Sequence, residues 1–222
     1  MTTILLENDT IPTQDLMNCL TILNKQLKIW GNAWGIDAVA VLATAKPDMI
    51  VNITDKNRHV GAYGYHTVEN GVPISYCSPR AISRIYGHYT PAFYTKQLKV
   101  LGKVIRPAKL IHGELVTQGL ITVILHETFE MLADAHIDKL SKPDSKGRTW
   151  LIEVCDHTSG QYSVDTVNGN VYVIPNSTLP SYYDLKGKAP YDLLGKLKTP
   201  FDQSAVHFYG YWKDANGKLV KL

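Results

Sequence analysis

One stretch of the chain, residues 123–136, restricts fold and function more than any other. It reads VILHETFEMLADAH, an apolar sequence interrupted by ionisable residues. His126 and Glu130 are four residues apart, so on an α-helix they project from neighbouring positions one turn apart. Glu127 follows His126 directly. The stretch therefore predicts an amphipathic helix, within an expected helical range of 114–138, whose polar face carries a site.

The spacing of these side chains indicates a metal site. His-Glu-x-x-Glu differs from the zinc-protease pattern His-Glu-x-x-His only at its last position. We predict that His126 and Glu130 bind a metal ion and that Glu127 is the catalytic general base. A glutamate in place of the second histidine makes the donor set more anionic and favours harder ions. Zinc is the predicted ion, with Mn²⁺, Mg²⁺ and Ca²⁺ as alternatives.

The third metal ligand is left open by the sequence. His136 has the ten-residue spacing of one class of zinc proteases, but Ala133 stands where that class has a helix-breaking glycine. On an unbroken helix ten residues span ~15 Å, so His136 is not expected to reach the same ion. Asp134 lies about 12 Å along the axis from His126, and it is predicted to brace the site or to bind metal with Glu130.

Two acidic residues further along the chain are the other candidates. Glu153 and Asp156 lie in and just after a strand expected over 149–155, and either could supply a carboxylate. On a regular strand the two side chains would point to opposite sides. The alternative for the whole motif is a solvated helix face that binds nothing, although the apolar residues on both sides of it argue against this.

His66 is predicted to contact substrate. It ends the segment 61–66, which precedes a turn at Asn70-Gly71 and an expected strand over Val72–Cys77. An edge strand beside a metal-binding helix can hold a peptide backbone by strand addition. The segment is a candidate for that role from its position in the chain.

Composition excludes several classes of protein. The 222 residues are 45% hydrophobic and 19% charged, which favours one folded domain over 1–222 with a sizeable core. A net charge of +3 is too small to indicate nucleic acid, and the sequence has no membrane-spanning run and no secretory signal. The three cysteines are far apart and odd in number, so we expect reduced, buried thiols and a protein made in a cytoplasm.

A basic, tyrosine-rich excursion at about 78–112 interrupts the domain. No Asp or Glu occurs over 70–113, which holds seven Lys and Arg residues. Such asymmetry is typical of a surface for another subunit, and a solvated basic flank is the alternative.

The remaining pattern predicts α+β architecture. A helix is expected from about 14 to 30, with Thr13 as its N-cap, and a β-hairpin is expected around Asn168-Gly169. The other expected elements are strands at 4–6, 36–43 and Met49–Ile53 and a second C-terminal hairpin over 207–222.

Several motifs in one order resemble a family. They are a Trp-Gly helix end at 34–35, Gly-Tyr-His at 64–66, the His126 motif running to Asp134, Glu-Val-Cys-Asp at 153–156 and Leu-Pro-Ser-Tyr-Tyr-Asp at 179–184. Together they are similar to the zincin-like metallopeptidases of tailed phages and bacteria over most of 20–210. The resemblance implies a zincin-like fold with a mixed sheet, a central metal-site helix and C-terminal hairpins. It implies functional positions at His126, Glu127, Glu130, Asp134, Glu153 and Asp156. The group commonly has proline where this chain has Ala135 and His157.

Two functions follow as hypotheses. The first is a metal-dependent hydrolase of phage type that acts on a peptide or protein in the host cytoplasm. The second is a phage virion or assembly protein that keeps the fold and a structural or vestigial metal site. In that case the 78–112 excursion would contact other virion subunits.

Overall fold

The computed structural model describes residues 1–56, 62–86, 119–168, 170–205, 210–214 and 217–221. Most of the predicted basic excursion, 87–112, lies outside the described residues, as does the beginning of the predicted central helix at 114–118. The first residues of the excursion form helix α2 (Pro79–Tyr86).

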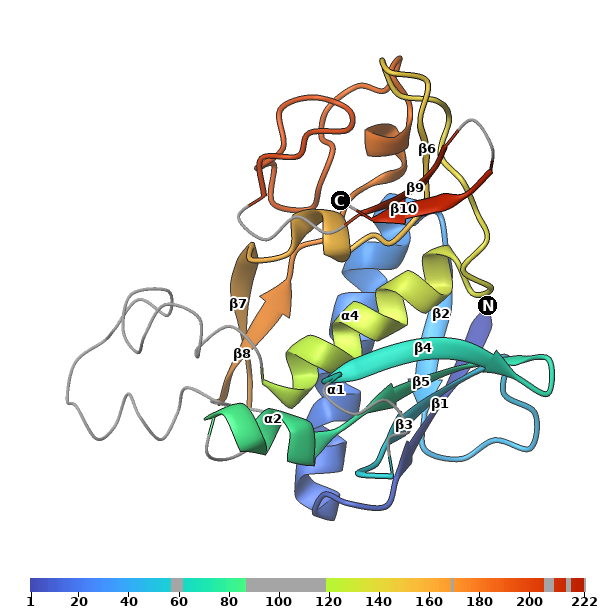
Figure 1. The fold of residues 1–222 in the computed structure, drawn as a ribbon. Coiled ribbons are helices and arrows are strands. Elements are labelled where there is room, and N and C mark those ends of the chain that lie inside the picture. The colour runs from blue at the N-terminus through green and yellow to red at the C-terminus, as the bar shows by residue number, and fades with distance from the viewer. Residues whose placement is uncertain (57–61, 87–118, 169, 206–209, 215–216, 222) are drawn as a thin grey trace.

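A five-stranded mixed sheet forms one layer of the fold (Figure 1). Its strand order is β2-β1-β3-β5-β4, and every neighbouring pair is parallel except β4 with β5. The strands are β1 (Thr2–Asn8), β2 (Ala38–Val41), β3 (Met49–Ile53), β4 (Gly64–Glu69) and β5 (Val72–Cys77). The sheet confirms the predicted α+β class and the predicted bounds of β3 and β5.

Helix α1 (Thr13–Trp34) packs on α4 (Leu120–Ala133) through stacked aromatic rings. The centroids of Trp30 and Phe129 are 5.1 Å apart and their planes differ by 5°. The helix begins at Thr13, with Pro12 rather than Thr13 as its N-cap. It ends one turn later than predicted, where Gly35 adopts a left-handed conformation (φ 69°) and donates its N–H to the carbonyl of Gly31.

Helix α4 lies inside the molecule rather than on its surface. All of its residues are buried except His126, which is partly exposed. The predicted amphipathic helix is therefore a core helix whose polar side chains face an internal cleft instead of bulk water. Its contacts with α1, β4, β5 and β8 (Asn170–Pro175) explain why it can be apolar on nearly every side.

The expectation that Ala133 continues the helix was wrong. Helix α4 ends at Ala133, and the buried carboxylate of Asp134 accepts the backbone N–H groups of Asp138 at 3.1 Å and Lys139 at 2.9 Å. Alanine favours a helix by less than 1 kcal/mol over most residues, whereas two hydrogen bonds to a buried carboxylate contribute more.

The C-terminal part contains the two predicted hairpins (Figure 1). Strand β7 (Tyr162–Val167) pairs with β8, and β9 (Tyr211–Lys213) pairs with β10 (Leu219–Lys221) and with β6 (Thr149–Trp150). The predicted strand over 149–155 was wrong beyond Trp150. The chain turns at Val154 and Cys155 and enters a short 3₁₀ helix, η2 (Asp156–Thr158). A second 3₁₀ helix is η3 (Pro180–Tyr183).

None of the described helices has the length and apolar character that a membrane span requires.

Candidate metal centre

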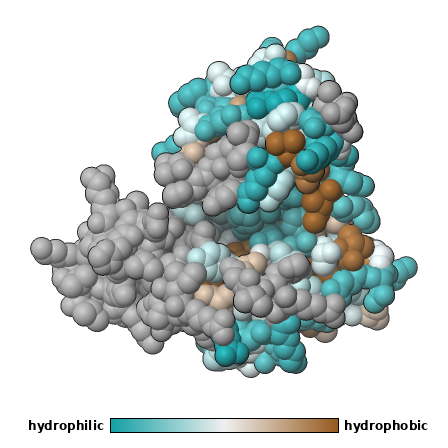
Figure 2. Space-filling model, viewed as in Figure 1, coloured by the Kyte–Doolittle hydropathy of each residue, from teal (hydrophilic) through white to brown (hydrophobic). Residues whose placement is uncertain are grey.

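A cleft of about 670 Å³ lies along α4 and β4 and is closed on the other side by residues of the C-terminal part. Figure 2 shows this face of the molecule hollowed between its upper and lower parts, with hydrophilic residues visible in the hollow. Six of the seven predicted site residues line the cleft: His66, His126, Glu127, Glu130, Glu153 and Asp156. One helix, one strand and the segment 153–156, which are distant from one another in sequence, thus supply ionisable groups to a single space.

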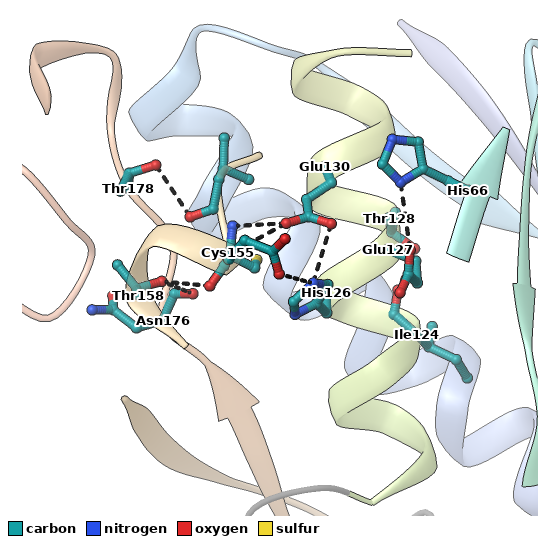
Figure 3. A network of polar contacts seen from close by, with 12 residues as sticks. His66, Ile124, His126, Glu127, Thr128, Glu130, Cys155, Thr158, Asn176 and Thr178 are labelled. Carbon is teal, nitrogen blue, oxygen red and sulfur yellow. Dashed lines mark hydrogen bonds and ion pairs between the residues drawn. The ribbon is translucent and has the colours of Figure 1, made fainter. Parts of the chain in front are cut away.

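His126 lies between two carboxylates from different segments (Figure 3). Its Nε2 atom is 3.1 Å from Glu130 Oε2 and 3.3 Å from Asp156 Oδ1. Two donor atoms bound at ~2.0–2.1 Å to one tetrahedral ion are ~3.3 Å apart. Both distances are close to that separation, and they also suit charged hydrogen bonds from a protonated His126 to the two carboxylates.

Glu130 also joins the helix to the turn that carries Asp156. Its Oε1 atom accepts the backbone N–H groups of Cys155 at 3.2 Å and Asp156 at 3.1 Å. These two bonds orient the carboxylate and direct Oε2 towards His126, as hydrogen bonds around metal sites commonly do.

Cys155 is a donor that the sequence analysis missed. Its buried thiol, the imidazole of His126 and the carboxylate of Glu130 place one donor atom each within 4.8 Å of one another. We had interpreted Cys155 as a packing thiol on a regular strand. The turn at Val154 and Cys155 breaks the strand alternation. It brings the thiol close to His126 and Glu130, although Asp156 and not Cys155 lines the cleft. The sequence signal for this donor was that Cys155 directly precedes Asp156, a candidate carboxylate ligand.

Glu127 contacts His66, which projects from β4 towards α4 (Figure 3). His66 Nδ1 lies 3.4 Å from Glu127 Oε2, and both side chains are buried. Gly64 permits this approach, because a Cβ atom there would lie 2.6 Å from Val123 Cγ1 and 2.8 Å from Glu127 Oε1. The backbone of β4 therefore packs directly against the face of α4 that carries Glu127.

Burial and mutual repulsion shift the protonation of the cluster. Burial, and then the carboxylates of Glu130 and Asp156, raise the pKa of Glu153 to about 10. Burial alone would lower the pKa of His126, but the carboxylates of Glu130 and Asp156 raise it well above its usual value. Protons thus offset the crowded negative charge in the ion-free protein, and a metal ion would replace them.

Asp134 and His136 lie apart from this cluster. The carboxylate of Asp134 is committed to the backbone N–H groups that end α4, and it does not line the cleft. His136 is exposed in the turn after the helix, so ending the helix at Ala133 does not bring it to the site.

Comparison of the chain with protein-family models, with curated proteins and with solved structures gave no match.

The donor atoms present fit a divalent cation. The cluster offers an imidazole nitrogen, carboxylate oxygens and a thiol from two segments of the chain, α4 and the turn at 154–156, and these groups could hold a metal ion.

Proposed function

We propose that this chain is a metal-dependent hydrolase of the zincin-like metallopeptidase type. One observation carries the proposal: His126 Nε2 lies 3.1 and 3.3 Å from carboxylate oxygens of two separate segments, with Glu127 adjoining it in the same cleft. Carboxylates that are taken out of water and placed close together are costly unless an ion or a proton compensates their charge.

The ion would be held by His126 Nε2, Glu130 Oε2 and Asp156 Oδ1, with zinc as the expected metal. A divalent ion in this position supplies Lewis acidity, which polarises a carbonyl group and lowers the pKa of water. Glu130 holds the turn of Asp156 against α4 through two backbone hydrogen bonds, so the three donors keep their arrangement.

Glu127 is the general base of the proposed reaction. It takes a proton from a water molecule and passes it to the leaving nitrogen of the scissile bond. Its carboxylate is oriented by His66 at 3.4 Å and is confined by the close approach of Gly64. Because Glu127 and His126 are adjacent on α4, the base and the metal donors share one rigid element.

Strand β4 would hold the substrate. Among the described residues it pairs with β5 alone, and several of its residues line the cleft beside Glu127. An extended peptide can add to such a strand through main-chain hydrogen bonds. The substrate class we propose is therefore a peptide or protein segment in extended conformation, with His66 beside it.

The test joins metal analysis to one conservative substitution. Wild-type protein is expected to bind metal and to cleave members of a mixed peptide library. The Glu127→Gln variant is expected to keep the metal and to cleave at least ~100-fold more slowly, because it loses the base. Glu7→Gln, which changes an exposed residue of β1 outside the cleft lining, is the matched control and should cleave as wild type. Absence of metal from the wild-type protein would refute the proposal.

A second candidate is a phage virion or assembly protein with a structural metal site. The specific observation is Cys155, whose thiol lies with the His126 and Glu130 donors. His126, Glu130, Asp156 and Cys155 together would close a four-coordinate shell, as structural zinc sites do. Retained metal, no cleavage by either form, and loss of folding on chelation would favour this candidate.

A further inference from the structure

The cleft contains a second group of donor atoms, of which the proposed hydrolase uses only that of Glu130 as a ligand. His66, Glu127 and Glu130 each offer one donor atom, and these atoms lie within 4.8 Å of one another. Strand β4 supplies the histidine and α4 supplies both glutamates (Figure 3). Glu130 belongs to both groups, so the two sets of donors are contiguous.

His66 provides an independent indication of a ligand. Its residue is 8% exposed, and its Nε2 atom has no hydrogen-bond partner within the part of the chain that the structure describes. A buried ring nitrogen without a partner is costly, because it has lost its water and gained nothing in exchange. A bound ion removes that cost.

The contact between His66 and Glu127 uses the other ring nitrogen, Nδ1, and is long. Nδ1 and Oε2 are 3.4 Å apart, which is longer than the 2.7–3.2 Å of ordinary N–H···O hydrogen bonds. The imidazole can therefore bind an ion without giving up a strong hydrogen bond.

The negative charge of the cleft also favours a second cation. Four carboxylates line it, and Lys221 is the one lysine or arginine among the lining residues. One divalent ion bound by Glu130 and Asp156 leaves the carboxylate of Glu127, beside His66, without a cation. Buried carboxylates in such number require compensation by cations or protons.

We propose that the cleft holds two divalent cations, the second bound by His66, Glu127 and Glu130, with Glu130 shared between the sites. This inference rests on the proposed function, because the shared glutamate is a ligand in both. It also adds regulation: an ion on Glu127 occupies the base, so the fully loaded protein cannot take the proton from water. The second site then makes the hydrolase sensitive to excess metal.

The experiment measures stoichiometry directly. Chelator-treated protein is equilibrated with buffered free Zn²⁺ over a wide range, and bound metal per chain is determined by mass spectrometry. Wild type is expected to bind two ions in two steps. His66→Gln should keep the first step and weaken the second at least ~10-fold, while His136→Gln, which changes an exposed histidine outside the cleft, should match wild type.

A second readout uses manganese. Two Mn²⁺ ions that share a carboxylate lie ~3.5–4 Å apart, so their electron paramagnetic resonance spectrum should show an exchange-coupled pair. The coupling should be absent from His66→Gln. This spectrum is obtained on the wild type, so the test stands even where the variant does not fold.

The outcomes separate the two proposals. Two ions in wild type, with the second lost from His66→Gln, support the second site. One ion in wild type at every free zinc concentration overturns the second site and leaves the proposed hydrolase intact. Two ions in both wild type and His66→Gln overturn the assignment of His66. No ion at all refutes both proposals.

Discussion

Glu130 performs two tasks that a pair of substitutions can separate. Its Oε1 accepts the backbone N–H groups of Cys155 and Asp156, and its Oε2 faces His126 as a candidate metal donor. Glu130→Gln keeps a carbonyl oxygen for the two N–H groups but removes the anionic donor. Glu130→Ala removes both functions.

Glu130→Ala should destabilise the protein because the backbone N–H groups of Cys155 and Asp156 lose their acceptor. Each buried N–H that loses its acceptor costs ~1–3 kcal/mol, so the variant should lose ~2–6 kcal/mol of unfolding free energy. For a domain of this size, 1 kcal/mol corresponds to ~2–4 °C in Tm. The metal-free alanine variant should therefore melt at least ~4 °C below metal-free wild type. Metal-free Glu130→Gln should melt within ~2 °C of it.

Thermal melts with and without Zn²⁺ complete the assay. Free metal at ~1,000 times its Kd stabilises the wild-type fold by ~4 kcal/mol, which raises Tm by ~8–16 °C. Neither variant should show that increase. A metal-free Glu130→Ala protein that melts with wild type would show that the carboxylate does not hold the turn. A Glu130→Gln protein with the full zinc response would show that it is not a ligand.

Three further predictions concern β4, acid stability and the thiols. Gly64→Ala should lower the unfolding free energy by ~1–3 kcal/mol in denaturant titrations, because its Cβ overlaps Val123 and Glu127; an unchanged midpoint would contradict the packing. Burial lowers the pKa of His157 from 6.5 to about 4, so stability present above pH 6.5 should fall by ~3 kcal/mol as the pH drops through 6.5 towards 4. A His157→Phe variant should lose that part of the pH dependence, and an identical profile would refute it. The three cysteines are buried, so a thiol reagent should label none in the folded protein and all three after unfolding; rapid labelling of native protein would contradict their burial.

Local patterns determined much of the fold. Strands β3 and β5 have the predicted bounds, and the Asn70-Gly71 turn joins β4 to β5 with both residues at positive φ. The spacing of His126, Glu127 and Glu130 placed all three on one helix, and that helix lines the cleft. These features depend on residues within a few positions of one another, so short-range periodicity and turn chemistry are enough to predict them.

Hydrogen bonds between carboxylate side chains and the backbone decided the rest. Ala133 has a high helix propensity, yet the helix ends there because Asp134 accepts the backbone N–H groups of residues that follow it. The turn at Cys155 is held by Glu130, 25 residues earlier, and by Thr178, which donates to the carbonyl of Val154. These contacts bring the thiol close to His126 and Glu130 and place Asp156 at the cleft.

The sequence by itself determined which side chains α4 would carry and that they suit a metal ion. Only the tertiary structure decided which distant groups meet them: His66 from an edge strand, and Cys155 and Asp156 from a turn. The physical reason is that helix periodicity fixes where side chains project from one helix. Which elements come into contact depends on buried hydrogen bonds and packing between segments far apart in the chain.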